Sequence, residues 1–186
     1  MKRALLTLLL LTAVSGFLKA QFHYTETSPA GVLLVDGWYN ADPKLLPGDS
    51  KDVIAQKMAG VHKVDTWKHY YETGKLAVEE HYTTAGIPEG NWKQWHPDGK
   101  LSQEINYTTG KAVFYHANGA VAETGMMKGF IRVGKWEGYH QNGKVNFTGS
   151  YDSMGNKDGV WMIYDSTGSL MAKETYSKGK LLSSGK

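Results

Sequence analysis

The stretch Gly90-Asn91-Trp92-Lys93-Gln94-Trp95-His96-Pro97-Asp98-Gly99-Lys100-Leu101, followed by a polar run that ends at Tyr107, sets the pattern of this chain. The same order of residues returns over residues 134–151 and again over residues 159–176. A pattern that recurs at a nearly fixed spacing is the sequence signature of an architecture built from similar stacked units. The sequence therefore predicts a repeat protein.

Five units follow the pattern, each with a lead residue, a second aromatic residue three positions later and a glycine four positions after that. The lead residues are Trp67, Trp92, Ala112, Trp136 and Trp161. The second aromatics are Tyr70, Trp95, Tyr115, Tyr139 and Tyr164. The glycines are Gly74, Gly99, Gly119, Gly143 and Gly168. Because the third unit has alanine in place of the lead tryptophan, we interpret it as degenerate.

Each unit has the pattern of a β-hairpin, with two β-rich segments around a polar turn that ends in glycine. Asn-Gly and Asp-Gly pairs commonly form two-residue type I′ turns. Pro97 argues against that turn, because type I′ needs positive φ where proline is held near about −65°. We expect a type I turn with Pro97 and Asp98 at its centre and Gly99 in the left-handed region, and the same geometry in the other four units.

The lead and second aromatics are three residues apart, so on a regular strand they point to opposite faces of the sheet. Either both faces carry aromatic side chains or a bulge brings the two together, and the sequence leaves both arrangements open. The expected fold class is all-β, an elongated single-layer antiparallel meander of about five hairpins. Its predicted parts are a mixed N-terminal cap over residues 21–64, repeats over residues 65–182 and a tail over residues 183–186.

The units resemble the variant form of the MORN repeat, with the pattern Gly-x-Trp-x-x-Tyr-x-x-Asn-Gly-Lys-Leu and a trailing Tyr. The resemblance covers about residues 63–182 and is carried best by Gly134, Trp136, Tyr139, Asn142, Gly143, Lys144 and Val145. It implies an extended run of hairpins used for protein or membrane contact and for scaffolding. Some bacterial members of the family are labelled antitoxin or immunity proteins.

Residues 21–64 are the least regular part of the chain. Residues 32–39 predict a strand, a turn at Asp36-Gly37 and room for another strand. Residues 50–59 predict a short helix that is capped by Asp49 or Ser50 and ends at Gly60. The apolar face of that helix would carry Val53, Ile54 and Met58. Because repeat arrays need atypical end units, we expect this region to be a cap.

Residues 1–20 have the pattern of a secretory signal peptide, with a basic start, an apolar run and a small residue before the Ala20-Gln21 junction. Cleavage after Gly16 is an alternative, and an uncleaved anchor is the rival, although the apolar run is shorter than the roughly 20 residues that span a bilayer. The segment carries Lys2, Arg3 and Lys19, so its removal takes the net charge from +3 to zero.

A neutral mature chain has no basic stripe for nucleic acid. The chain also contains no cysteine, which excludes disulfides and a lipoprotein anchor. The sequence therefore predicts a periplasmic or secreted protein with no stable membrane anchor after cleavage.

The search for chemistry begins with His96, His116 and His140, which share one repeat position. Equivalent positions in successive hairpins lie two strands apart, roughly 9.6 Å, so three would span roughly 19 Å. That is too far to share a zinc ion with bonds of about 2 Å. The loop over residues 152–159 lacks the register of a calcium loop. We therefore predict no metal and no cofactor.

No catalytic residue is predicted either. Five glutamates on second strands are expected to lie on a solvated face: Glu79, Glu80, Glu104, Glu123 and Glu174. A nucleophile elbow, a phosphate loop, a His-Glu-x-x-His motif and a cysteine nucleophile are all missing from the sequence. The sequence therefore argues against an enzyme.

The remaining functional candidates are the aromatic columns, because exposed Trp and Tyr favour protein interfaces. The candidate contact residues are Trp67, Tyr70, Trp92, Trp95, Tyr115, Trp136, Tyr139, Trp161 and Tyr164. The rival interpretation is that these rings simply fill a thin sheet. The expected function is an exported, non-catalytic scaffold in the cell envelope that binds another protein of unknown identity.

Two alternative functions stay open from the sequence. The first is a toxin-neutralising, antitoxin-like or immunity protein. The second is a hydrolase of envelope polymers, which would need a cleft with paired acids. The last strand, near Lys180-Leu181, would also be able to pair with another chain through its edge.

Overall fold

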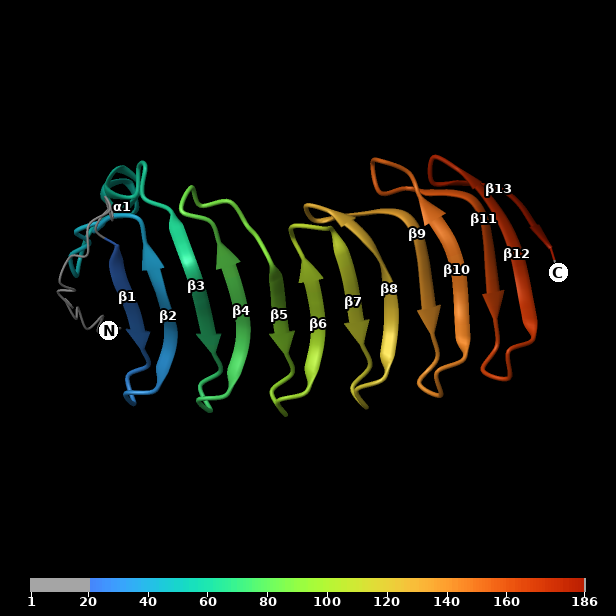
Figure 1. Cartoon of the computed structure of the whole chain (residues 1–186), viewed down its shortest axis with the longest axis horizontal. Coiled ribbons are helices and arrows are strands. Elements are labelled where there is room, and N and C mark those ends of the chain that lie inside the picture. The colour runs from blue at the N-terminus through green and yellow to red at the C-terminus, as the bar shows by residue number, and fades with distance from the viewer. Residues whose placement is uncertain (1–20, 186) are drawn as a thin grey trace, which may run out of the picture. The chain divides into compact units, whose positions relative to one another are not determined.

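The computed structural model describes residues 21–185, and the predicted signal peptide lies outside these residues. The chain forms two compact units, an N-terminal unit up to Gly90 and a C-terminal unit from Asn91. Apart from one short helix, the described secondary structure is β (Figure 1).

The N-terminal unit contains β1 (Phe22–Thr27), β2 (Leu33–Tyr39), α1 (Lys51–Lys57), β3 (Lys63–Tyr70) and β4 (Leu76–Tyr82). The C-terminal unit contains β5 (Asn91–Trp95), β6 (Leu101–Asn106), β7 (Lys111–Tyr115), β8 (Val121–Lys128), β9 (Ile131–Tyr139), β10 (Val145–Tyr151), β11 (Lys157–Tyr164), β12 (Leu170–Ser177) and β13 (Lys180–Gly185). Within each unit, every strand pairs antiparallel with the next strand in sequence. The predicted all-β antiparallel meander is thereby confirmed within each unit.

The repeat turns have the predicted geometry. In the turn between β5 and β6, Gly99 N donates to His96 O at 2.8 Å and His96 N donates to Lys100 O at 2.8 Å. Gly99 has a φ of +93°, while Pro97 and Asp98 are not among the positive-φ residues. The corresponding glycines of the other four units have φ values of +80°, +88°, +80° and +92°. The choice of a type I turn followed by a left-handed glycine is therefore confirmed.

This geometry gives a first testable prediction, for the variant Gly143→Val. A Cβ at Gly143 would meet no atom within 4 Å, so the cost comes from the φ of +80° alone. A β-branched residue in this region is expected to lower the free energy of unfolding by on the order of 1–2 kcal/mol. Thermal melting followed by circular dichroism measures the loss. Gly143→Asn is the control with a smaller loss, and unchanged melting of the valine variant would contradict the turn assignment.

The region predicted as a cap contains another hairpin of the repeat type. Ser28 N donates to Val32 O at 2.8 Å and Gly31 N donates to Ser28 O at 2.9 Å, which reproduces the repeat turn. Gly31 has a φ of +81°. The predicted turn at Asp36-Gly37 is wrong, because β2 runs through both residues as one strand. Gly37 lies within the strand because its missing side chain leaves room for the Trp67 ring of the next strand.

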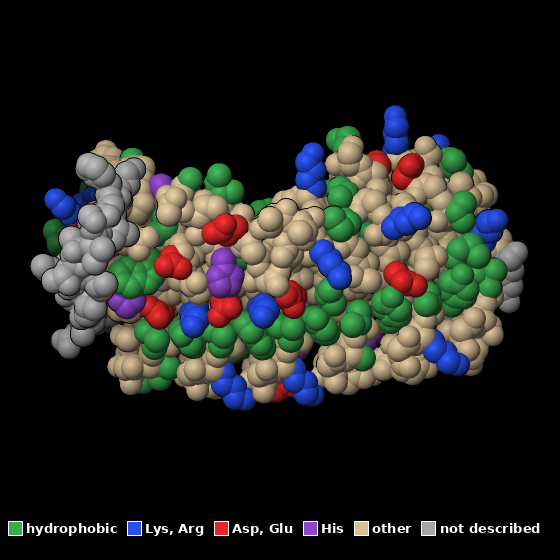
Figure 2. Space-filling model, in the orientation of Figure 1, with side chains coloured by type: hydrophobic (Ala, Val, Ile, Leu, Met, Phe, Trp, Pro, Cys, Tyr) green, Lys and Arg blue, Asp and Glu red, His purple; other side chains and the backbone are tan. Residues whose placement is uncertain are grey.

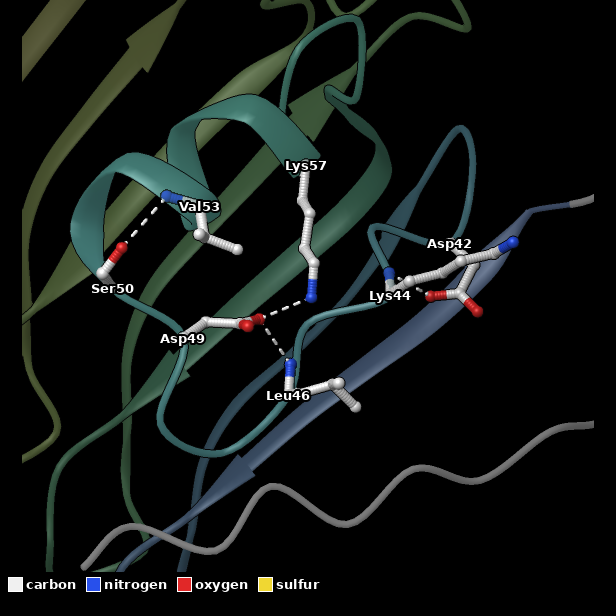
Figure 3. Close-up of polar contacts among 7 residues, drawn as sticks. All are labelled: Asp42, Lys44, Leu46, Asp49, Ser50, Val53 and Lys57. Atoms are coloured by element: carbon white, nitrogen blue, oxygen red, sulfur yellow. Dashed lines mark hydrogen bonds and ion pairs between the residues drawn. The ribbon is translucent and has the colours of Figure 1, made fainter.

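Helix α1 begins where the sequence indicates, but it ends at Lys57 with Met58 as its C-cap, before the predicted end at residue 59. Ser50 is the N-cap, and its Oγ accepts a hydrogen bond from Val53 N at 3.4 Å (Figure 3). Asp49 instead fixes the preceding loop, since its Oδ2 accepts from Leu46 N and from Lys57 Nζ, both at 2.7 Å (Figure 3). The expected apolar face is not packed, because Val53 and Ile54 are 37% and 39% exposed.

Residues 183–185, expected to form a tail, belong to β13. The turn before this strand has positive φ at both Lys178 (+48°) and Gly179 (+82°), as a type I′ turn requires. β13 pairs with β12, and all of its residues are exposed.

Candidate interaction surface

The lead tryptophans of three units are buried against glycines of the preceding strand. Trp67, Trp136 and Trp161 are each 2% exposed. A Cβ added at the facing glycine would lie inside each indole: 2.2 Å from Trp67 at Gly37, 2.3 Å from Trp136 at Gly125 and 2.2 Å from Trp161 at Gly149. Each indole therefore rests directly on the main chain of its neighbour strand.

A cation four residues before each of these tryptophans lies over the ring. Lys63 Nζ is 4.7 Å from the Trp67 ring centroid, Arg132 Cζ is 4.4 Å from that of Trp136 and Lys157 Nζ is 4.3 Å from that of Trp161. Such cation–π contacts stabilise most where they are partly desolvated. Each indole lies between a glycine and a cation, and this arrangement buries the ring without a second layer of sheet.

Two of the glutamates that the sequence assigned to a solvated face hold these cations in place. Glu80 Oε2 accepts from Lys63 Nζ at 2.6 Å, and Glu123 Oε2 lies 2.7 Å from Arg132 Nη1. Burial by itself would raise the pKa of the Glu80 carboxyl, but His69, Lys63 and Tyr82 outweigh burial and lower this pKa to about 2. These acids therefore stabilise the indole stacks.

Burial corrects the list of candidate contact residues. Trp67, Trp136 and Trp161 present too little surface to take part in binding, because their rings lie between glycine and cation. Trp92 is half-buried, with its ring centroid 4.3 Å from that of Tyr107. The lead aromatics therefore build the sheet, as the rival interpretation proposed.

In the unit with Ala112, the small and the large side chain of the buried pair have exchanged strands, so the repeat is not damaged. Ala112 is fully buried and pairs across the strands with Ile105, which is 9% exposed. Ile105 stands six residues after its turn glycine, the same offset at which Gly125 and Gly149 follow theirs. The large residue has moved to the neighbouring strand, and the pair keeps a small and a large member. This offset was visible in the sequence, but its partner strand was not.

The second aromatics of the C-terminal unit lie on the opposite face. Tyr139 Oη donates to Glu137 Oε2 at 2.6 Å, and Glu137 alternates along β9 with the buried Trp136. Phe114, next to Tyr115, packs against Trp136 at 5.9 Å, so Tyr115 points away from that face. Both faces therefore carry aromatic rings, which answers the question that the sequence left open.

We name the surface that carries Tyr115, Tyr139 and Tyr164 the tyrosine face. These three residues are half-buried, as are Tyr70 and Trp95 in the corresponding positions of their units. The hydrogen bond to Glu137 and partial burial raise the pKa of the Tyr139 hydroxyl, so it stays a neutral donor at physiological pH. The tyrosine face thus keeps the part of the predicted contact surface that solvent reaches.

The tyrosine face is hollowed over β7 to β11. An open hollow of about 620 Å³ has Lys111, Met126, Lys135, Glu137 and Val160 among its lining residues. A smaller hollow of about 360 Å³ is lined by Lys111, Val113, Val121, Thr124, Tyr139 and Gly143. Val121, Met126 and Val160 are 37%, 42% and 48% exposed. Figure 2 shows a band of hydrophobic side chains across the strands of this unit, with Lys, Arg, Asp and Glu beside it.

The repeated histidines connect successive turns. His116 Nε2 donates to Tyr139 O at 2.8 Å and His140 Nε2 donates to Tyr164 O at 3.0 Å. Nε2 of His96, in the same position, is buried and has no hydrogen-bond partner in the described part of the chain. Over residues 21–185, no group of three or more His, Cys, Asp or Glu residues is arranged to hold a metal ion.

Turn residues next to these histidines add further bonds. Asn118 Nδ2 donates to Gln141 O at 3.2 Å and Asn142 Nδ2 donates to Ser166 O at 2.8 Å. Lys100 Nζ and Lys144 Nζ donate to Ala117 O and Thr167 O at 2.9 Å and 2.8 Å. We call these side-chain bonds to the next turn, together with those of His116 and His140, the turn ladder. The sequence showed the recurring residue types but not their partners.

The paired hairpins, the glycine-seated indoles and the turn ladder define an antiparallel β-hairpin repeat protein. The sequence pattern of the family described as MORN repeat variant matches residues 66–83, 88–109, 132–153 and 157–178. The chain belongs to this family, whose repeats indicate a binding or scaffold role. The matches pass over the Ala112 unit and the hairpin of β1 and β2.

Comparison with individual proteins adds little. No curated protein matches the sequence. One similar solved structure is that of an S. aureus TarM mutant in complex with fondaparinux, alpha-GlcNAc-glycerol and UDP. It is 11% identical, with a TM-score of 0.30, over 74% of this chain and 24% of that one. A likeness at this level carries no argument. Within residues 21–185, no helix is long and apolar enough to cross a bilayer.

Proposed function

We propose that this chain is an exported, non-catalytic scaffold that binds another protein through the tyrosine face of its C-terminal unit. The observation that carries the proposal is the open hollow of about 620 Å³ on that face. The opposite face is occupied by the chain's own indoles and the cations that cover them. The tyrosine face is therefore the broad surface that remains for a partner.

The composition of the tyrosine face suits a protein partner. Tyrosine and methionine are enriched in protein interfaces, and Tyr139 and Met126 line its two hollows. Lys111, Lys135 and Glu137 supply charges of both signs around the apolar side chains. Such a mixture favours a partner with a mixed polar and apolar surface over a polyanion such as nucleic acid.

The location of the partner follows from the N-terminal sequence. A basic start followed by an apolar run of signal-peptide length supports export. The lack of cysteine supports a protein that is not anchored through lipid. We therefore place the binding role in the cell envelope or outside the cell.

A capture experiment with matched variants tests the proposal. Tagged protein from residue 21 onward is incubated with envelope extract, and the recovered partner is identified by mass spectrometry. Tyr139→Ala is expected to reduce recovery about tenfold, since tyrosine at an interface centre contributes on the order of 1–2 kcal/mol. The control is Phe130→Ala, which removes a ring that is 86% exposed in the turn after β8.

Equal recovery with Tyr139→Ala and with the unchanged protein would refute binding through this face. Loss of the partner with Phe130→Ala would move the binding surface to the opposite ends of the strands. If the partner is toxic when produced alone, the alternative of a toxin-neutralising protein replaces the scaffold.

A further inference from the structure

Two turns of the ladder contain the dipeptide Asn-Gly, at residues 118–119 and 142–143. Asparagine followed by glycine is prone to deamidation, because no side chain shields the glycine nitrogen. That nitrogen loses its proton and attacks the asparagine Cγ, which closes a succinimide ring. The Cγ–Nδ2 bond breaks, and the leaving amide nitrogen takes up a proton and departs as ammonia. Water then opens the succinimide ring to aspartate or isoaspartate.

The folded turns oppose this reaction at both sites. Gly119 N and Gly143 N donate to His116 O and His140 O, each at 2.8 Å, so both nitrogens are engaged. The side-chain oxygens are held as well. Asn118 Oδ1 accepts from Ala120 N at 3.0 Å, and Asn142 Oδ1 accepts from Lys144 N at 3.1 Å. Reaction therefore requires the turn to open.

The two turns differ in how firmly the next hairpin holds them. The side-chain amide of Asn142 donates to Ser166 O at 2.8 Å, and Lys144 Nζ donates to Thr167 O of the same neighbouring turn at 2.8 Å. The side-chain amide of Asn118 donates to Gln141 O at 3.2 Å. The residue equivalent to Lys144 in this turn is Ala120, which cannot add a second bond.

The turn between β5 and β6 already has an aspartate at this position, Asp98, and there Lys100 donates to Ala117 O at 2.9 Å. A carboxylate is thus compatible with the turn when a lysine follows. The turn of Asn118 has no such lysine.

We propose that Asn118 is the deamidation site of the folded protein, and that its conversion breaks the amide bond from the turn between β7 and β8 to Gln141 O, leaving the bond from His116 Nε2 to Tyr139 O. The reaction replaces the donating amide by a carboxylate facing Gln141 O, so a bond becomes a repulsion. It also places a negative charge beside the turn of Gly143, which lines the smaller hollow with Val121 and Tyr139. The inference does not depend on the proposed function.

Incubation at mildly alkaline pH, followed by peptide mapping with mass spectrometry, tests this inference. In the folded protein, Asn142 is expected to deamidate about fivefold more slowly than Asn118, the factor for one additional hydrogen bond between turns. In concentrated urea the two rates are expected to converge, because both sites are Asn-Gly. Faster reaction at Asn142 in the folded protein, or the same ratio in urea, would overturn the proposal.

Two variants separate the ladder from local sequence. Ala120→Lys supplies the missing lysine and is expected to slow deamidation at Asn118 to the rate of Asn142. Lys144→Ala is expected to accelerate reaction at Asn142. As a stability readout, Asn118→Asp is expected to lower the melting temperature more than Asn142→Asp, and the reverse order would contradict the role assigned to Lys144.

Discussion

Replacing Trp136 with alanine is expected to lower the free energy of unfolding by about 3–5 kcal/mol. The indole is 2% exposed and packs with Ile105 and Ala112. Its loss also removes the ring beneath Arg132 and leaves a cavity over Gly125 on β8. Urea titration followed by circular dichroism measures the change without relying on tryptophan fluorescence.

The matched control for this variant is Trp95→Ala. Trp95 is a half-buried second aromatic that also belongs to the C-terminal unit, so its replacement by alanine removes less buried surface. Its expected loss is clearly smaller than that of Trp136→Ala. Equal losses would mean that the two aromatic columns contribute alike, against the division between a buried face and a tyrosine face.

The second large effect is expected for Gly125→Ile, alone and in combination. Alone, its Cβ lies 2.3 Å from the ring of Trp136, and overpacking of this kind costs about 3 kcal/mol or more. Combined with Trp136→Ala, the same isoleucine stands beside an alanine, as Ile105 stands beside Ala112. The double variant is therefore expected to be more stable than Gly125→Ile, with a coupling energy on the order of 1–3 kcal/mol.

Gly119→Ala is the control for this double-mutant cycle of Gly125→Ile and Trp136→Ala. A Cβ at Gly119 meets no atom within 4 Å, so its effect arises from φ and should add to that of Trp136→Ala. Additive behaviour of Gly125→Ile as well would contradict the exchange of small and large partners.

The local features of this chain could be predicted because the signals lie within one hairpin. Pro97 excludes one turn type and Gly99 satisfies the other, and the structure has that turn in all five units. Ser50 marks the start of α1 for the same reason, since a helix cap depends on its nearest neighbours.

The features that failed depend on the neighbouring strand. Asp36-Gly37 is a turn signature by local rules, but Gly37 belongs to a strand because Trp67 of the next strand occupies the space of its missing side chain. The lead tryptophans were candidates for contact because nothing in their spacing reveals that Lys63, Arg132 and Lys157 cover them. Register between strands decides both outcomes, and turn chemistry alone does not supply it.

The same limit applied to the histidines. Their spacing argued against a shared zinc site, and the structure places His116 and His140 beside the turns. That each imidazole bonds to the main chain of the following hairpin could be found only in three dimensions. Binding of a protein partner through the tyrosine face and export of the chain stay predictions.

The turn ladder has a consequence for how such a chain tolerates change. Its donors are side chains, but its acceptors are main-chain carbonyls, which every residue type presents. A hairpin can therefore exchange its interior residues, as Ala112 and Ile105 do, while the preceding hairpin still holds it in register. Alignment of neighbours and filling of the interior are thus separate tasks, and a sequence can drift in one while the other is kept.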